Sequence, residues 1–211
     1  MLKKGDATSE DKIMQAAKEV FMKYGLYGAR MQDIADVAGI NKALLHYYYR
    51  NKEKLFDKVF EGALQKYFHQ TDVFSDDTLP IKQRLTTYVN NLIDFLEEYP
   101  QMTIFIIKEI SVNPTLFKEK VMAIKKPTNI PLIKALENAI QSGEIESIDA
   151  AMFMVNVQSM CAYPFIATPL FRHIFSANNK DWNTFSAENL KISVKKFIEM
   201  SIRVKQTPTH A

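Results

Sequence analysis

The chain has 211 residues, of which 47% are hydrophobic and 24% are charged, and these proportions exclude a disordered or fibrous protein. Its single cysteine, Cys161, excludes an internal disulfide framework and fits a protein of the reducing cytoplasm. The net charge of +3 lies entirely in residues 1–60, which contain eleven Lys and Arg against eight Asp and Glu, so a polyanionic partner is expected there.

The first predicted element is an amphipathic helix. Apolar residues recur at helical spacing from Ile13 to Tyr24. Thr8 and Asp11 form a variant of the capping box at the start, and Gly25 supplies a stop signal.

Two short helices should follow the first one. One is expected over residues 31–38, ended by Gly39, and the other begins after Asn41, a suitable N-cap, and continues to about Tyr48. Two short helices joined by a glycine-containing turn and braced by a longer first helix predict a helix-turn-helix, whose second helix enters the major groove of DNA.

The rest of the chain also shows helical periodicity. Further helices are expected over residues 52–70, 81–99, 101–112, 115–124, 130–142, 148–166 and 187–204, with a loop over 71–80. No strand pattern of comparable quality occurs. The predicted fold class is therefore all-α, with about nine or ten helices: a helix-turn-helix head at residues 8–50, then a helical ligand-binding and dimerisation domain at 51–205, whose residues 51–70 form a connecting helix.

Residues 31–56 read MQDIADVAGINKALLHYYYRNKEKLF and carry a specific resemblance. They resemble the TetR (tetracycline repressor) family, whose signature runs approximately I-A-x-x-A-G-V-S-x-G-T-L-Y-Y-H-F-x-N-K-E-x-L. The detailed resemblance covers residues 10–60. The positions that match are Ile34, Ala35, Ala38, Gly39, Leu45, Tyr47, Asn51, Lys52, Glu53 and Leu55.

The resemblance implies a DNA-binding role for eight residues. Base edges are expected to meet Lys42, Ala43 and His46, with Gln32 at the start of the second helix. Phosphates are expected to meet Tyr47, Tyr48 and Lys52, and Arg30 can add a charge where the family has a hydroxyl residue. Ile34, Ala35, Ile40, Leu45 and Tyr49 should point inward. Ala43, Leu44 and His46 depart from the family pattern, which indicates a different operator sequence.

The C-terminal part is rich in Met and aromatic residues, most of which should be core, although adaptable Met side chains also suit a pocket. An effector that is mainly apolar, with one or two polar groups, is expected there. The expected lining is Phe68, Tyr88, Phe95, Phe105, Met152, Asn156 and Met160. Two apolar helices, residues 149–165 and the last one, favour a homodimer.

The predicted function is that of a ligand-responsive regulator, expected to be a repressor, that binds a palindromic operator as a homodimer. Two alternatives remain open: a ligand-independent architectural DNA-binding protein, and an enzyme with a vestigial head. No catalytic pattern, metal-ligand spacing or cofactor motif is present in the sequence, so no enzyme activity, metal or cofactor is expected.

Residues 150–167 are apolar enough to raise the question of a membrane span. The polar side chains of Asn156, Gln158 and Ser159 favour a buried helix instead, so no membrane partner is expected. The N-terminus has two early lysines but no apolar run behind them, so no secretory signal and a cytoplasmic location are expected.

Overall fold

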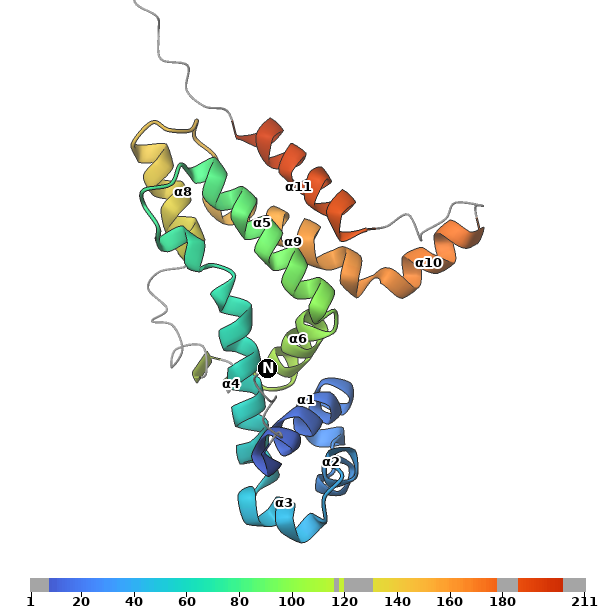
Figure 1. Ribbon diagram of the computed structural model, residues 1–211. Coiled ribbons are helices and arrows are strands. Elements are labelled where there is room, and N and C mark those ends of the chain that lie inside the picture. The colour runs from blue at the N-terminus through green and yellow to red at the C-terminus, as the bar shows by residue number, and fades with distance from the viewer. Residues whose placement is uncertain (1–7, 116–117, 120–130, 178–185, 203–211) are drawn as a thin grey trace, which may run out of the picture. The chain divides into compact units, whose positions relative to one another are not determined.

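The structure is a computed structural model that describes residues 8–115, 118–119, 131–177 and 186–202 (Figure 1). Within these ranges it contains ten α-helices, one 3-10 helix and no strand, so the predicted all-α fold class is confirmed. The described chain forms two compact units. The first consists of residues 8–65 with the described part of 104–125, and the second of residues 66–103 with the described part of 126–202.

The first unit contains the N-terminal helices. They are α1 (Ser9–Gly28), α2 (Met31–Ala38), α3 (Lys42–Tyr48) and α4 (Lys52–His69), the last of which continues into the second unit at Lys66. The capping box at the start of α1 is complete, since the Thr8 side chain accepts from Asp11 N and the Asp11 carboxylate accepts from Thr8 N. The predicted bounds of α2 and α3 agree with the observed ones.

Gly25 interrupts α1 and does not end it. Its backbone has φ 70° and ψ −178°, a region that is essentially restricted to glycine. The chain then resumes one further helical turn to Gly28, and Ala29 N donates to Gly25 O at 3.2 Å. The glycine predicted as a stop signal is therefore a kink.

Aromatic rings hold the core of the first unit together. Phe56 of α4 packs edge-on against Phe21 of α1, with ring centroids 5.1 Å apart. Phe105 lies edge-on to both Phe56 and Phe60, at 6.1 and 5.6 Å. These rings join α1, α4 and α6 (Met102–Val112) within the first compact unit.

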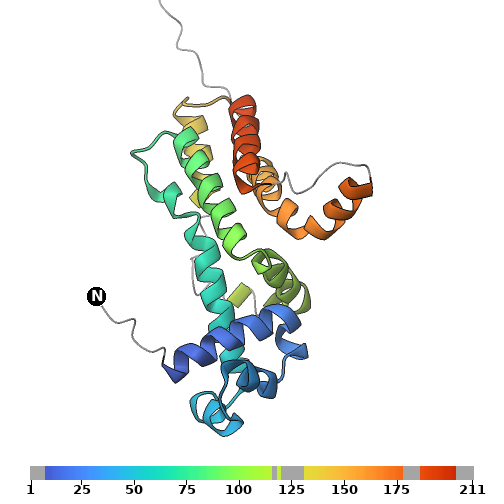
Figure 2. The same cartoon turned by 45° about the vertical axis from the view of Figure 1, so that its right-hand side comes forward.

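The second unit is also helical. Besides the end of α4 and the start of α6, it contains η1 (Asp72–Ser75), α5 (Ile81–Glu98), α8 (Pro131–Gln141), α9 (Ala150–Ile166), α10 (Thr168–Ala177) and α11 (Ala187–Ser201). Helices α5, α9 and α11 pack against one another, and α8 packs against α9 and η1 (Figures 1 and 2). The buried residues Val89, Val157 and Val194 belong to this packing.

Two elements of the second unit differ from the predictions. The expected loop over 71–80 contains the short helix η1, and α10 was not predicted. The signal for α10 was present, because Leu170, Phe171, Ile174 and Phe175 recur at helical spacing behind Pro169, a residue that suits a first helical turn. The helix expected over 115–124 lies mostly outside the described residues.

Helix α9 contains the most apolar region of the second unit. No single described helix is long and apolar enough to cross a membrane. Helices α9 and α10 reach the length and hydropathy of a span only together, and they are bent by 68° relative to each other (Figure 2).

Candidate nucleic-acid interface

The turn between α2 and α3 is built from two local caps. Gly39 ends α2 in the left-handed region, at φ 66° and ψ 34°, and the Ile40 N–H donates to Ala35 O at 3.1 Å. The Asn41 side-chain oxygen then accepts from Leu44 N at 2.7 Å and starts α3. The two caps complete the predicted helix-turn-helix, because they stop one helix and start the next within three residues.

The inner face of the motif is anchored as expected. Ile34, Ala35 and Leu45 are fully buried, and Ile40 is half-buried. This apolar contact holds α3 against α2, so that the opposite face of α3 is left to solvent.

Tyr49, at the C-terminal end of α3, is 6% exposed and ties the motif to two other helices. Its hydroxyl donates to Glu10 Oε1 of α1 at 2.9 Å. Lys58 Nζ of α4 lies 3.7 Å from the same carboxylate oxygen and 5.2 Å from the centre of the Tyr49 ring. Burial, and next the bond to Glu10, raise the pKa of the Tyr49 hydroxyl. The sequence predicted that Tyr49 is core, but not that Glu10 is its partner.

The outer face of α3 carries the expected DNA-binding side chains. Lys42, Ala43 and His46 are exposed. Tyr47 is 79% exposed, and its ring lies edge-on to the Tyr48 ring at a centroid distance of 5.5 Å. The structure therefore brings together an ammonium, a methyl group, an imidazole and a phenol on one solvent-facing surface, groups suited to base edges and phosphates.

The residues at the start of α2 come shortly before α3 in the sequence. Arg30 is exposed and occupies the N-cap position without a capping bond from its side chain. The exposed Gln32 amide donates to Asp36 Oδ1 at 2.8 Å, which orients it along α2. Arg50, two residues after α3, is also exposed and lies outside the set expected from the sequence.

Lys52 has a structural contact that the sequence did not predict. Its Nζ donates to Ala29 O at 3.0 Å and so ties the start of α4 to the link between α1 and α2. Asn51 caps α4 by accepting from Glu53 N at 2.7 Å, as expected. An ammonium has three donors, so the contact with Ala29 leaves Lys52 able to meet a phosphate as well.

A buried inner face, a solvent-facing recognition helix and a concentration of positive charge together define a helix-turn-helix DNA-binding protein. Residues 13–59 match the family model described as "Bacterial regulatory proteins, tetR family". Over these residues the chain is similar to the DNA-binding region of this family of transcriptional regulators.

Three known proteins illustrate the similarity. The uncharacterized HTH-type transcriptional regulator YhgD of Bacillus subtilis is 26% identical over 138 residues, which are 65% of this chain and 72% of YhgD. The HTH-type transcriptional repressor NicS of Pseudomonas putida is 29% identical over 101 residues, which are 48% of each chain. The crystal structure of AibR in complex with isovaleryl coenzyme A and operator DNA matches with a TM-score of 0.67 and 17% identity, over 90% of this chain and 97% of AibR. The structural match shows a shared fold.

The residues expected to line an effector pocket are divided between the two units. Phe105 belongs to the first unit, where it packs on Phe56 and Phe60. Met152, 55% exposed, and Asn156 lie on the solvent-facing side of α9.

The other four expected pocket residues belong to the second unit. Tyr88 and Phe95 are buried, and Phe68 and Met160 are half-buried. Helix α9 is apolar on nearly all sides, so its sequence does not reveal which face is buried.

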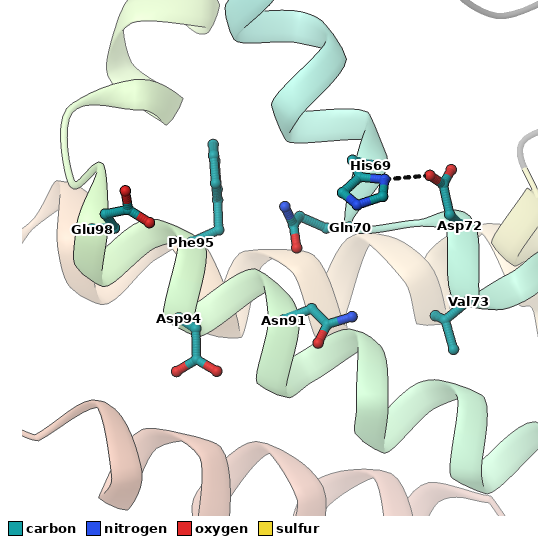
Figure 3. A pocket seen from close by; sticks show the side chains of 8 residues that line it. All are labelled: His69, Gln70, Asp72, Val73, Asn91, Asp94, Phe95 and Glu98. Carbon is teal, nitrogen blue, oxygen red and sulfur yellow. Dashed lines mark hydrogen bonds and ion pairs between the residues drawn. The ribbon is translucent and has the colours of Figure 1, made fainter. Parts of the chain in front are cut away.

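A groove of about 530 Å³ in the second unit has a different character (Figure 3). Its lining is His69, Gln70, Asp72, Val73, Asn91, Asp94, Phe95 and Glu98, so Phe95 is the one residue that it shares with the expected pocket. His69 pairs with Asp72, and the Asp94 carboxylate points toward α11, where it pairs with Lys191. This open, polar groove does not match a site for a mainly apolar effector.

Proposed function

We propose that this protein is a ligand-responsive repressor of the cytoplasm that binds a palindromic operator as a homodimer and is released by a small, mainly apolar effector. The observation that carries the proposal is the solvent-facing surface of Lys42, Ala43, His46 and Tyr47 on α3, backed by the buried Leu45. This arrangement suits insertion of α3 into a major groove.

Exposed apolar residues on two helices support the homodimer. On α9 they are Met152, Val155 and Tyr163, and on α11 they are Ile192 and Met200, each at least 46% exposed. Because α9 and α11 pack against each other, two copies can bury both helices in a four-helix contact about a two-fold axis. Such an axis would present two α3 helices to successive major grooves.

Polar side chains inside the second unit favour an effector that carries an uncharged polar group. The Gln158 amide of α9 donates to the Tyr67 hydroxyl of α4. Burial raises the pKa of the Tyr88 hydroxyl, and the nearby Tyr67 and Cys161 add to that shift. These groups therefore stay uncharged at neutral pH and suit hydrogen bonds to an uncharged polar group, while the surrounding aromatic rings suit an apolar body.

The operator is tested by selecting duplexes from a random library with the purified protein. We expect a palindromic motif whose half-sites lie about one helical turn, roughly 10 base pairs, apart. His46→Ala and Lys42→Ala should change the preferred half-site, whereas Lys134→Ala, an exposed lysine of α8, should leave it unchanged. Recovery of the same motif with both α3 variants would remove these residues from the base-reading set.

Contact of Lys52 with a phosphate is tested by salt dependence. Lys52→Met removes the ammonium, so binding to every duplex should weaken and the slope of log affinity against log salt should fall by about one. The loss of the Ala29 contact is a structural cost, which thermal unfolding of the same variant measures separately. A salt slope equal to that of the wild type would leave Lys52 with the structural role alone.

Dimerisation is tested by light scattering at micromolar concentration. Ile192→Asp should shift the protein toward monomer and weaken operator binding, because a carboxylate is costly in an apolar contact. Val112→Asp, which places the same charge at an exposed position of α6, is the matched control. A wild-type monomer with full operator affinity would refute the homodimer.

Release by an effector is tested with a panel of small molecules that includes 1-decanol and isovaleryl coenzyme A. A ligand that acts must bind the DNA-free state more tightly than the DNA-bound state, so it should raise the unfolding temperature and weaken operator binding together. Tyr67→Phe should reduce that response. If no compound acts and the protein binds random duplexes as tightly as selected ones, the architectural alternative is favoured.

A further inference from the structure

A buried carboxylate of α6 contacts the kink of α1. Glu109 is 6% exposed, and its Oε1 accepts from the Leu26 N–H at 3.4 Å, across 83 positions of sequence. Both residues belong to the first unit. The kink frees this N–H, because the backbone of Gly25 leaves the helical conformation one residue earlier.

The carboxylate lies directly against the backbone at the kink. A Cβ added at Gly25 would come within 2.8 Å of Glu109 Oε1 and 3.4 Å of Lys108 Nζ. Two features therefore require glycine at this position: its backbone φ of 70° and the close approach of α6. The contact between the two helices leaves no room for another side chain.

Glu109 is a costly residue at this position. Burial raises the pKa of its carboxyl group, and the bond from Leu26 and the charge of Lys108 offset this only in part. Among the described residues Glu109 accepts one long hydrogen bond, which offsets only a small part of the cost of removing a carboxylate from water. An apolar side chain of similar size would avoid this desolvation cost and would lose only the bond from Leu26 N, so packing alone does not account for a carboxylate here.

The short segment that Glu109 holds leads directly into the DNA-binding motif. Ala29 is 2% exposed, and its carbonyl oxygen accepts from Lys52 of α4. One residue later, Arg30 O accepts from Ile34 N of α2. The path from α1 to α2 is therefore fastened at Leu26 by α6 and at Ala29 by α4.

We propose that Glu109 is a positioning residue for operator binding: by holding Leu26, it sets the direction in which the chain enters α2 and so the register of α3 on DNA. The inference rests on the proposed function.

The test compares two substitutions at one site. Glu109→Leu keeps the volume but removes the acceptor, and Glu109→Gln keeps an oxygen that can accept from Leu26 N. Glu137→Leu, at an exposed position of α8, is the matched control. For each variant we would measure affinity for the selected operator and for a random-sequence duplex, the unfolding temperature, and hydrogen exchange of the Leu26 amide.

We expect Glu109→Leu to bind the operator about five- to tenfold more weakly, with random-duplex affinity within twofold and an unfolding temperature equal to or above that of the wild type. Glu109→Gln should restore operator affinity to within twofold, and the Leu26 amide should be protected from exchange in the wild type and the Gln variant but not in the Leu variant.

Unchanged operator affinity in Glu109→Leu would overturn the proposal. Equal losses in Glu109→Leu and Glu109→Gln would overturn it too, because they would show that the charge and not the acceptor matters. If Glu109→Leu fails to fold, exchange of Leu26 in Glu109→Gln decides: loss of protection there overturns the proposal. Failure of the wild-type chain to select any operator is a separate outcome, which overturns the proposed function and this inference together.

Discussion

Replacing Gly25 by Ala probes the kink of α1 most directly. A non-glycine residue at φ 70° and ψ −178° costs about 1 to 3 kcal/mol. The new Cβ would also meet Glu109 Oε1 at 2.8 Å. The carboxylate can move aside only by giving up its bond from Leu26 N, which adds about 1 kcal/mol. The expected loss of stability is therefore about 2 to 4 kcal/mol.

Thermal and urea unfolding measure this loss. For a chain of this length, about 2 to 4 °C is lost per kcal/mol, so the midpoint of Gly25→Ala should fall by roughly 5 to 15 °C. Gly39→Ala is the matched control, because Gly39 also has a positive φ of 66° but nothing lies within 4 Å of an added Cβ. That variant should lose only the conformational preference, about 1 to 2 kcal/mol.

The double variant Gly25→Ala, Glu109→Ala isolates the contact with α6. It should lose less stability than the sum of the two single variants, because the clash is absent once the carboxylate is removed. Equal losses for Gly25→Ala and Gly39→Ala would refute the reasoning, since they would show that α6 does not approach the kink.

Further predictions concern a helix, a pH dependence and a thiol. Gly62→Ala in α4 should stabilise the protein by about 0.5 to 1 kcal/mol in urea unfolding, because nothing lies within 4 Å of the added Cβ and alanine favours a helix. Because the pKa of Glu109 is raised, the folded state binds more protons than the unfolded state at pH values just above the ordinary pKa of Glu. The contribution of Glu109 to the free energy of unfolding should therefore fall as pH rises through that window. Glu109→Gln should flatten this part of the plot of stability against pH. Burial raises the pKa of the Cys161 thiol to about 12, so iodoacetamide at pH 8 should alkylate the native protein at least about a hundredfold more slowly than the urea-unfolded protein, and equal rates would contradict the burial.

The sequence alone predicted the helix-turn-helix closely, because its signals are local. The residues that start and stop α2 and α3, Gly39 and Asn41 among them, act within four positions of sequence. The inner face followed from helical spacing, which placed Ile34 and Leu45 inside. A short motif whose caps and apolar stripe agree leaves few alternatives for its backbone.

Tertiary structure decided what joins distant segments. Glu109 meets Leu26 across 83 positions and Glu10 meets Tyr49 across 39, and no spacing rule connects such pairs. The buried face of α9 was equally hidden, since a helix that is apolar on nearly all sides carries no directional signal, and its neighbours α5, α8 and α11 determined which side is buried. Local hydrogen bonding and periodicity thus determined the DNA-binding motif, whereas long-range packing decided how α6 reaches that motif and which residues of the second unit are buried.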